Sequence, residues 1–197
     1  VVGYAPDDDQ LCIHFTNATS GAFQPQVNVS HTSSIIDLAF GDFTGNGQDE
    51  MVSIQSSGKV SVDQFSSKTN AFSTRDSTTV TIPGSTTSAT LTHMLFDYFA
   101  GPQNLPSLIA CQANGDATVL FWANNTNTIA SGSTLSGVAS DAVVGDFDGD
   151  QDLDIVASTP NGHRSFENGG PTGWSGDSHT RLITLTNATI LDYDLDF

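Results

Sequence analysis

Five aspartates at alternate positions form the stretch of this sequence best suited to chemistry. They are Asp146, Asp148, Asp150, Asp152 and Asp154. Calcium takes roughly six to eight oxygen ligands, and Gly149 permits a tight turn that lets alternate side chains converge. Without a cation these carboxylates would repel one another. The stretch therefore predicts a calcium loop, with side-chain ligation by Asp146, Asp148, Asp150 and Asp154 and a backbone carbonyl from Asp152. The alternative is a solvated acidic turn.

An earlier stretch carries oxygen-bearing side chains at the same spacing but with less charge. These residues are Asp42, Thr44, Asn46, Gln48 and Glu50. Because calcium affinity follows the number of charged ligands, this loop is expected to bind calcium more weakly. A metal-free turn closed by Asx-type hydrogen bonds is the alternative, and the sequence favours neither.

Both stretches belong to a repeat with a period of roughly 50 residues, which is the size of a propeller blade. Its copies are anchored on Asp42, Asp97, Asp146 and Asp194. The copy at Asp97 has lost the candidate ligands and is expected to form a plain loop. The copy at Asp194 keeps half a site, together with Asp196. The sequence thus predicts one strong calcium loop and one weak one.

Each copy contains the elements that would position its loop. Short apolar runs precede and follow the loop, as at residues 142–144 and 155–157. A turn such as Asn161-Gly162 then leads into a third strand, because Asn-Gly between apolar runs is a strong hairpin signal. An outer strand follows, expected at residues 79–82 in one copy. No segment shows sustained helical periodicity, so the chain is predicted to be all-β.

These units predict a single domain over residues 1–197, a β-propeller of about four blades. Three units span about 35–82, 91–130 and 140–186. The fourth would combine a C-terminal strand at 190–197 with residues 1–31, which align with the later strands of a unit. The C-terminal strand would close the structure by pairing with the N-terminal blade, either of its own chain or of a neighbour.

Composition excludes several classes of function. The net charge is −17, from 22 acidic and five basic residues, which disfavours binding to nucleic acid or to anionic membrane surfaces. No apolar run is long enough to insert into a membrane. The histidines lack zinc-ligand spacing, and neither a nucleophile elbow nor a phosphate loop occurs, so the chain is not expected to be an enzyme. Cys12 and Cys111 lie in apolar stretches and are expected to be buried free thiols.

Two further features concern the surface. Sequons for N-glycosylation begin at Asn17, Asn28, Asn124 and Asn187, and together they favour a secreted eukaryotic protein. Trp174 lies in a turn-rich segment, where an exposed aromatic ring would suit a glycan or protein contact. Trp122 continues an apolar strand and is expected in the core.

An acidic loop within an all-β repeat of this length resembles the FG-GAP/VCBS family, which includes the integrin α-chain propeller and several lectins and adhesins. Phe40-Gly41 matches the first half of the motif, and residues 3–6 and 157–160 resemble the Gly-Ala-Pro half. Family propellers usually have more than four blades, so a small ring, half of a two-chain ring and an open array are all open.

The resemblance implies structural calcium sites and a role in recognition or assembly. The expected function is an extracellular, calcium-stabilised structural or adhesive module that assembles through its terminal strand into an oligomer or filament. Its partner would be another copy, another extracellular protein or a glycan. The alternatives are a carbohydrate-binding lectin and a domain of a glycan-active enzyme.

Overall fold

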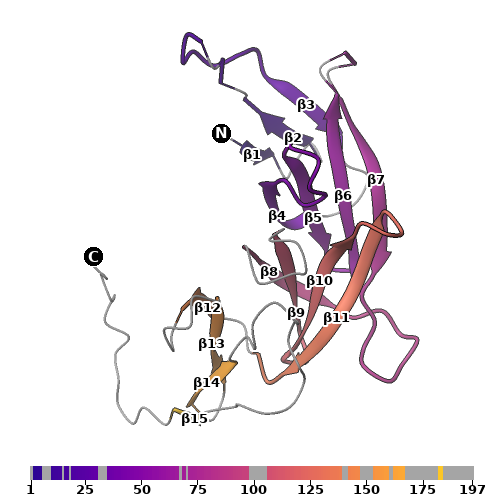
Figure 1. The fold of residues 1–197 in the computed structure, drawn as a ribbon, viewed down its shortest axis with the longest axis vertical. Coiled ribbons are helices and arrows are strands. Elements are labelled where there is room, and N and C mark those ends of the chain that lie inside the picture. Colours follow the sequence, from indigo (N-terminus) through magenta and orange to yellow (C-terminus); the bar gives the residue numbers. More distant parts are fainter. Residues whose placement is uncertain are drawn as a thin grey trace.

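A computed structural model gives the fold of the chain, which Figure 1 shows as a ribbon. The structure describes residues 2–5, 10–14, 16–17, 19–30, 35–66, 68–69, 71–97, 106–138, 142–146, 153–159, 162–166 and 182–183. Among these residues every regular element is a β-strand. No helix in this part of the chain is long and apolar enough to span a membrane.

In the described part of the chain, fifteen strands form four antiparallel sheets, each following the order of the sequence. The first sheet contains β1 (Val2–Ala5), β2 (Gln10–Ile13) and β3 (Val27–Ser30). The second contains β4 (Ile35–Gly41), β5 (Glu50–Gln55), β6 (Lys59–Ser66) and β7 (Ala71–Thr79). The third contains β8 (Leu91–Asp97), β9 (Ser107–Gln112), β10 (Asp116–Ala123) and β11 (Thr128–Ser136). The fourth contains β12 (Ala142–Gly145), β13 (Asp154–Thr159), β14 (Gly162–Phe166) and β15 (Leu182–Ile183).

The four sheets fall in the four stretches of sequence that form the repeat, with two corrections to strand positions. The outer strand expected at residues 79–82 is instead β7, which ends at Thr79. Val80 leaves the sheet because its N–H donates to Gly58 and its carbonyl accepts the N–H of Ala89. In the third sheet, β11 continues to Ser136 rather than ending at residue 130. The predicted strand at 190–197 lies outside the described residues.

Strand register corrects the alignment of the third copy. In the second sheet Phe40 faces Met51 and Gly41 faces Glu50. In the third sheet Phe96 faces Leu108, so Asp97 takes the place of Gly41 rather than that of Asp42. The chain between these strands is longer in the third sheet, and a sequence alignment on aspartates therefore slips by one residue. In the fourth sheet Gly145 faces Asp154, as the sequence alignment predicted.

The second and third sheets stack face to face around the main core. Cross-strand partners share a face, and Val52, Ile54, Val60 and Val62 all belong to the face that meets the third sheet. The third sheet contributes Met94, Leu108, Ala110, Leu120 and Trp122 to the same cluster. Burial of this apolar surface is the main force that holds the two sheets together.

The third and fourth sheets stack in the same manner. The opposite face of the third sheet carries Ile109, Cys111, Ala117 and Val119, which pack against Ile155 and Ala157 of the fourth. Strand β9 therefore lies between two cores, and all six of its residues are buried. A strand covered on both faces reads as a continuous apolar run rather than as an alternating one.

Polar side chains join the second and third sheets at their inner and outer strands. Asp37 in β4 accepts N–H groups from Leu38 and from Met94 of β8, both at 2.9 Å. Asp76 in β7 accepts the N–H of Ile129 in β11 at 2.8 Å. These carboxylates satisfy backbone groups at strand edges, which would otherwise have no partner within their own sheet.

Candidate metal-binding loops

The loop between β4 and β5 contains the five weaker candidate ligands. Its ends are held by the pairing of Gly41 with Glu50. Gly45 has a φ of 71°, a left-handed conformation that favours glycine, and it occupies the position of Gly149 in the later loop. Phe43 is fully buried, with ring centroids 6.3 Å from Trp122 and 6.0 Å from Phe96. The loop is therefore anchored to the next sheet by an aromatic side chain.

Asp42 closes the first half of this loop. Its two carboxylate oxygens accept the N–H groups of Asn46 and Gly47, each at 2.8 Å. The side-chain oxygen of Asn46 accepts the N–H of Gln48 at 2.8 Å. These are the Asx-type hydrogen bonds of a turn that needs no metal. Each carboxylate oxygen has two lone pairs, so one acceptor site on each remains after these bonds.

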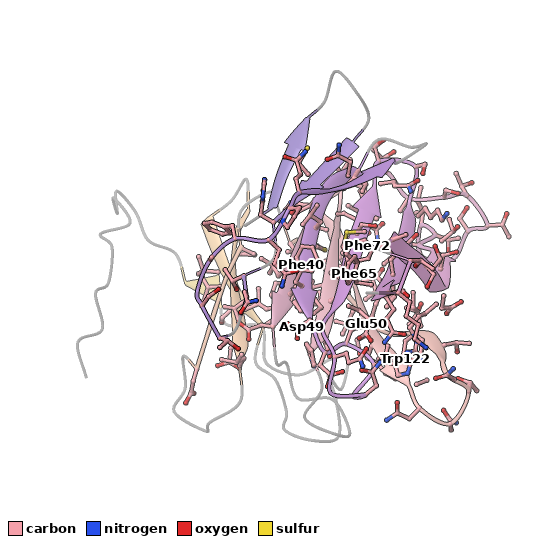
Figure 2. The ribbon with its side chains drawn as sticks, turned by 90° about the horizontal axis from the view of Figure 1, so that it is seen from above. Phe40, Asp49, Glu50, Phe65, Phe72 and Trp122 are labelled. Atoms are coloured by element: carbon pink, nitrogen blue, oxygen red, sulfur yellow. The ribbon has the colours of Figure 1, made fainter. Side chains whose placement is uncertain are left out.

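Glu50 closes the second half and is fully buried. Its carboxylate accepts the N–H of Thr44 at 3.1 Å, the Thr44 hydroxyl at 3.0 Å and the side-chain amide of Asn46 at 2.7 Å. A buried carboxylate is tolerated when hydrogen bonds satisfy it in this way. Asp49, the preceding residue, is exposed, and Figure 2 shows the two neighbours at the same end of the sheet.

The structure thus brings together four of the five weaker candidates. Asp42, Thr44, Asn46 and Glu50 are connected through hydrogen bonds within the loop. Gln48 is not part of this side-chain cluster, because its side-chain oxygen accepts the amide of Gln64 in β6 at 2.9 Å. Each Asp42 oxygen keeps one acceptor site beside these bonds, so the loop is compatible both with a metal-free turn and with a weak cation site.

The loop between β12 and β13 contains the five stronger candidates, and the structure describes its two ends. Asp146 is exposed, and Asp154 is buried at the start of β13. Asp154 faces Gly145, the relation that Glu50 has to Gly41. Asp148, Asp150 and Asp152 lie outside the described residues. The two acidic loops therefore leave and re-enter their sheets at equivalent positions.

Among the described residues, no three His, Cys, Asp or Glu side chains lie together as a metal site would require. At the five candidate positions, the loop from β4 to β5 offers two carboxylates, Asp42 and Glu50, alongside neutral oxygens, and Asp49 lies outside these positions. Such a donor set would give a weaker calcium site than five aspartates.

No protein-family model matches this chain, and neither does any curated protein. Among solved structures, the chain is similar to a protein from Lactobacillus plantarum, with 15% sequence identity and a TM-score of 0.54. The match covers 90% of this chain and 51% of the other, so this chain spans about half the length of that protein. At this identity the likeness concerns the fold alone.

Three of the four sequons can be placed. Asn17, Asn28 and Asn124 are exposed, Asn17 lies between β2 and β3, and Asn124 lies in the turn between β10 and β11. The fourth, Asn187, lies outside the described residues, as does the speculative ligand contact Trp174. Trp122 is buried, as expected, and the Arg75 guanidinium lies 5.9 Å from its ring centroid.

Both cysteines are free. Cys111 is buried between the third and fourth sheets, as expected for an apolar strand residue. Burial raises the pKa of Cys111 to about 12, and the nearby Asp37 carboxylate contributes to the increase. Cys12 is only half-buried, and its sulfur accepts the side-chain amide of Gln26 at 3.2 Å. The high pKa makes Cys111 a structural residue rather than a nucleophile.

Proposed function

We propose that this chain is a propeller-type, calcium-stabilised module of an extracellular protein, with a structural or adhesive role. The observation that carries the proposal is the equivalence of the two acidic loops. Both join the first and second strands of a sheet, with Gly41 facing Glu50 and Gly145 facing Asp154. Sheets that stack in sequence order, with acidic loops recurring at one position, are the arrangement of a propeller repeat.

We assign the calcium ion to the loop from Asp146 to Asp154. Five carboxylates in that stretch need a compensating charge, whereas the loop from Asp42 to Glu50 is supplied with donors from its own backbone and side chains. A bound ion would hold β12 and β13 together at one end of the fourth sheet. The ion thus has a structural role, and the resemblance to FG-GAP/VCBS repeats supports it.

The test is thermal unfolding with excess calcium, with excess chelator, and with magnesium as the control cation. We expect calcium to raise the midpoint more than magnesium, because only calcium accepts many oxygen ligands in a flexible loop. The variant Asp146→Asn should reduce the calcium-dependent increase, and Asp42→Asn should leave most of it. An unchanged midpoint in chelator would refute the structural ion.

The extracellular assignment is supported by the exposure of three sequons. It is tested by expressing the chain behind a secretion signal in eukaryotic cells. Enzymatic removal of N-glycans should lower the mass of the secreted protein, and Asn17→Gln and Asn124→Gln should each abolish one glycan. Secreted protein that carries no glycan would contradict the assignment.

A further inference from the structure

The connection between β7 and β8 differs in composition from the rest of this acidic chain. Residues 77–96 contain no Asp, Glu, Lys or Arg, although the whole chain carries 22 acidic residues. Within the connection, residues 85–88 read Ser-Thr-Thr-Ser and follow shortly after Pro83. Segments rich in Ser and Thr that also contain Pro are typical of O-glycosylated stretches. The connection therefore offers neighbouring hydroxyl groups on a neutral part of the chain.

These hydroxyl groups lie on the surface, at the tip of the connection. Residues 81–88 are exposed, whereas Val80 and Ala89 at its base are buried. The N–H of Ala89 donates to the carbonyl of Val80 at 2.8 Å and closes the base. Figure 1 shows the connection as a loop that projects from the end of β7. An enzyme can thus reach the tip while the core stays closed.

A type II turn shapes the tip. The N–H of Ser85 donates to the carbonyl of Ile82 at 2.9 Å, and Pro83 and Gly84 occupy the two central positions, with a φ of 74° at Gly84. The N–H of Ile82 donates in turn to the carbonyl of Thr87 at 2.9 Å. These bonds fix the backbone around residues 85–88, so the four hydroxyl groups have different surroundings.

Hydrogen bonds distinguish Thr86 from its neighbours. The hydroxyl oxygen of Ser85 accepts the N–H of Thr87 at 3.0 Å. Ser88 pairs with Thr81 in an isolated bridge at the base of the tip. Thr86 is exposed, and neither its backbone nor its hydroxyl makes a hydrogen bond with any described residue. Its hydroxyl can therefore react without the loss of a bond within the loop.

We propose that Thr86 carries an O-linked sugar, either a hexose or an N-acetylhexosamine. This inference rests on the extracellular assignment in the proposed function. A glycosyltransferase would bring a sugar whose anomeric carbon is bonded to a phosphate of a nucleotide or lipid carrier. The Thr86 Oγ1 forms a bond to that carbon while the bond from the carbon to the phosphate oxygen breaks. The phosphate leaves with the electron pair, and the hydroxyl proton passes to a base of the transferase.

The test is secretion of the chain from eukaryotic cells, enzymatic removal of N-glycans, and peptide mass spectrometry with fragmentation that retains the sugar. We expect the mass of a hexose or an N-acetylhexosamine on residues 85–88, with more on Thr86 than on Ser85, because the Ser85 oxygen already accepts an N–H group. The variant Thr86→Ala should remove most of this added mass. The matched control is Thr90→Ala, which changes an exposed threonine outside the tip of the same connection and should leave the added mass in place.

A second measurement protects the test against misfolding of the variant. Thr86→Ala without any sugar, purified from bacterial cells, should melt at the wild-type midpoint, because the substitution removes no hydrogen bond between described residues. An unmodified loop in the secreted wild-type chain, a phosphate in place of the sugar, or equal occupancy of Ser85 and Thr86 would each overturn the inference. Secreted protein with a glycan on Asn17 and an unmodified loop would leave the proposed function standing, so the two failures are distinguishable.

Discussion

Single side chains decide how the acidic loops are held. Glu50 is buried and accepts three hydrogen bonds, whereas its neighbour Asp49 is exposed. The two residues have the same charge and lie in the same loop, so they separate the effect of a buried carboxylate from that of a surface charge. A buried acceptor that is removed leaves its donors unpaired, which costs more than the loss of an exposed charge.

Glu50→Ala should lower the free energy of unfolding by about 1–3 kcal/mol, because Thr44 and Asn46 lose their acceptor. Asp49→Ala should change it by about 0.5 kcal/mol or less. Urea unfolding in excess chelator measures both variants without a contribution from calcium. Equal losses for the two variants would show that the hydrogen bonds to Glu50 contribute little to stability.

Cys111 should react slowly with iodoacetamide at pH 8, and Cys12 should react first. The thiolate is the reactive form, and a pKa of about 12 leaves very little thiolate on Cys111 at this pH. Peptide mass spectrometry over time gives the two rates. Labelling of Cys111 should become fast only in denaturant, and comparable rates in the folded protein would contradict the burial of this thiol.

The raised pKa of Cys111 affects the stability of the folded chain at high pH. The pKa of Cys111 is higher in the folded chain than the usual value of about 8.5 in an unfolded one. The protonated thiol therefore favours the folded state below about pH 8.5. This contribution is lost as the pH rises toward about 12, so the Cys111→Ala variant should show a weaker loss of stability over that interval.

At the level of elements, the turn between β5 and β6 supports the connection from β7 to β8. Gly58 has a φ of 92°, and a Cβ atom at this position would lie 2.7 Å from the carbonyl oxygen of Ala89 and 3.0 Å from that of Val80. The Gly58 carbonyl also accepts the N–H of Val80 at 2.9 Å. The turn and the connection thus fit together only when residue 58 has no side chain.

Gly58→Ala should lower the free energy of unfolding by about 2 kcal/mol or more, from backbone strain together with the steric overlap. Gly84→Ala is the matched control, since Gly84 also has a positive φ but has open space around it. That variant should cost about 1 kcal/mol from strain alone. Thermal unfolding compares the two, and a smaller loss for Gly58→Ala would contradict the close packing of turn and connection.

The apolar faces of the sheets account for their stacking against one another. The third sheet covers one face of the second sheet. Phe40 and Phe72 lie on the other face, with Phe65 beside Phe72 at a ring-centroid separation of 5.3 Å (Figure 2). The second and third sheets each have two apolar faces, so neither can bury its apolar side chains alone.

For the whole molecule, the dominant electrostatic property is the net charge of −17. Self-repulsion at this charge opposes the folded state, and salt screens it with a Debye length that falls to about 8 Å at physiological ionic strength. Sodium chloride should therefore raise the melting midpoint of the chain in excess chelator. A midpoint that falls with salt would show that attractive ion pairs outweigh the repulsion.

The sequence predicted the all-β class, because alternation and turn residues are local properties. It also placed Trp122 in the core and identified the acidic residues at which two loops leave and re-enter their sheets. It could not place Asp97 correctly, because the register of β8 on β9 is set by pairing across residues 98–106, a connection slightly longer than residues 42–49 between β4 and β5.

Only the tertiary structure showed the stacking of the sheets and the separate roles of equivalent residues. Asp42 and Glu50 have the spacing of metal ligands, yet their oxygens are supplied by N–H and O–H donors that converge only in the folded loop. Val143 lies in an apolar strand, yet 58% of its surface is exposed. Spacing along the chain determines which groups can converge, and packing determines which of them already have partners.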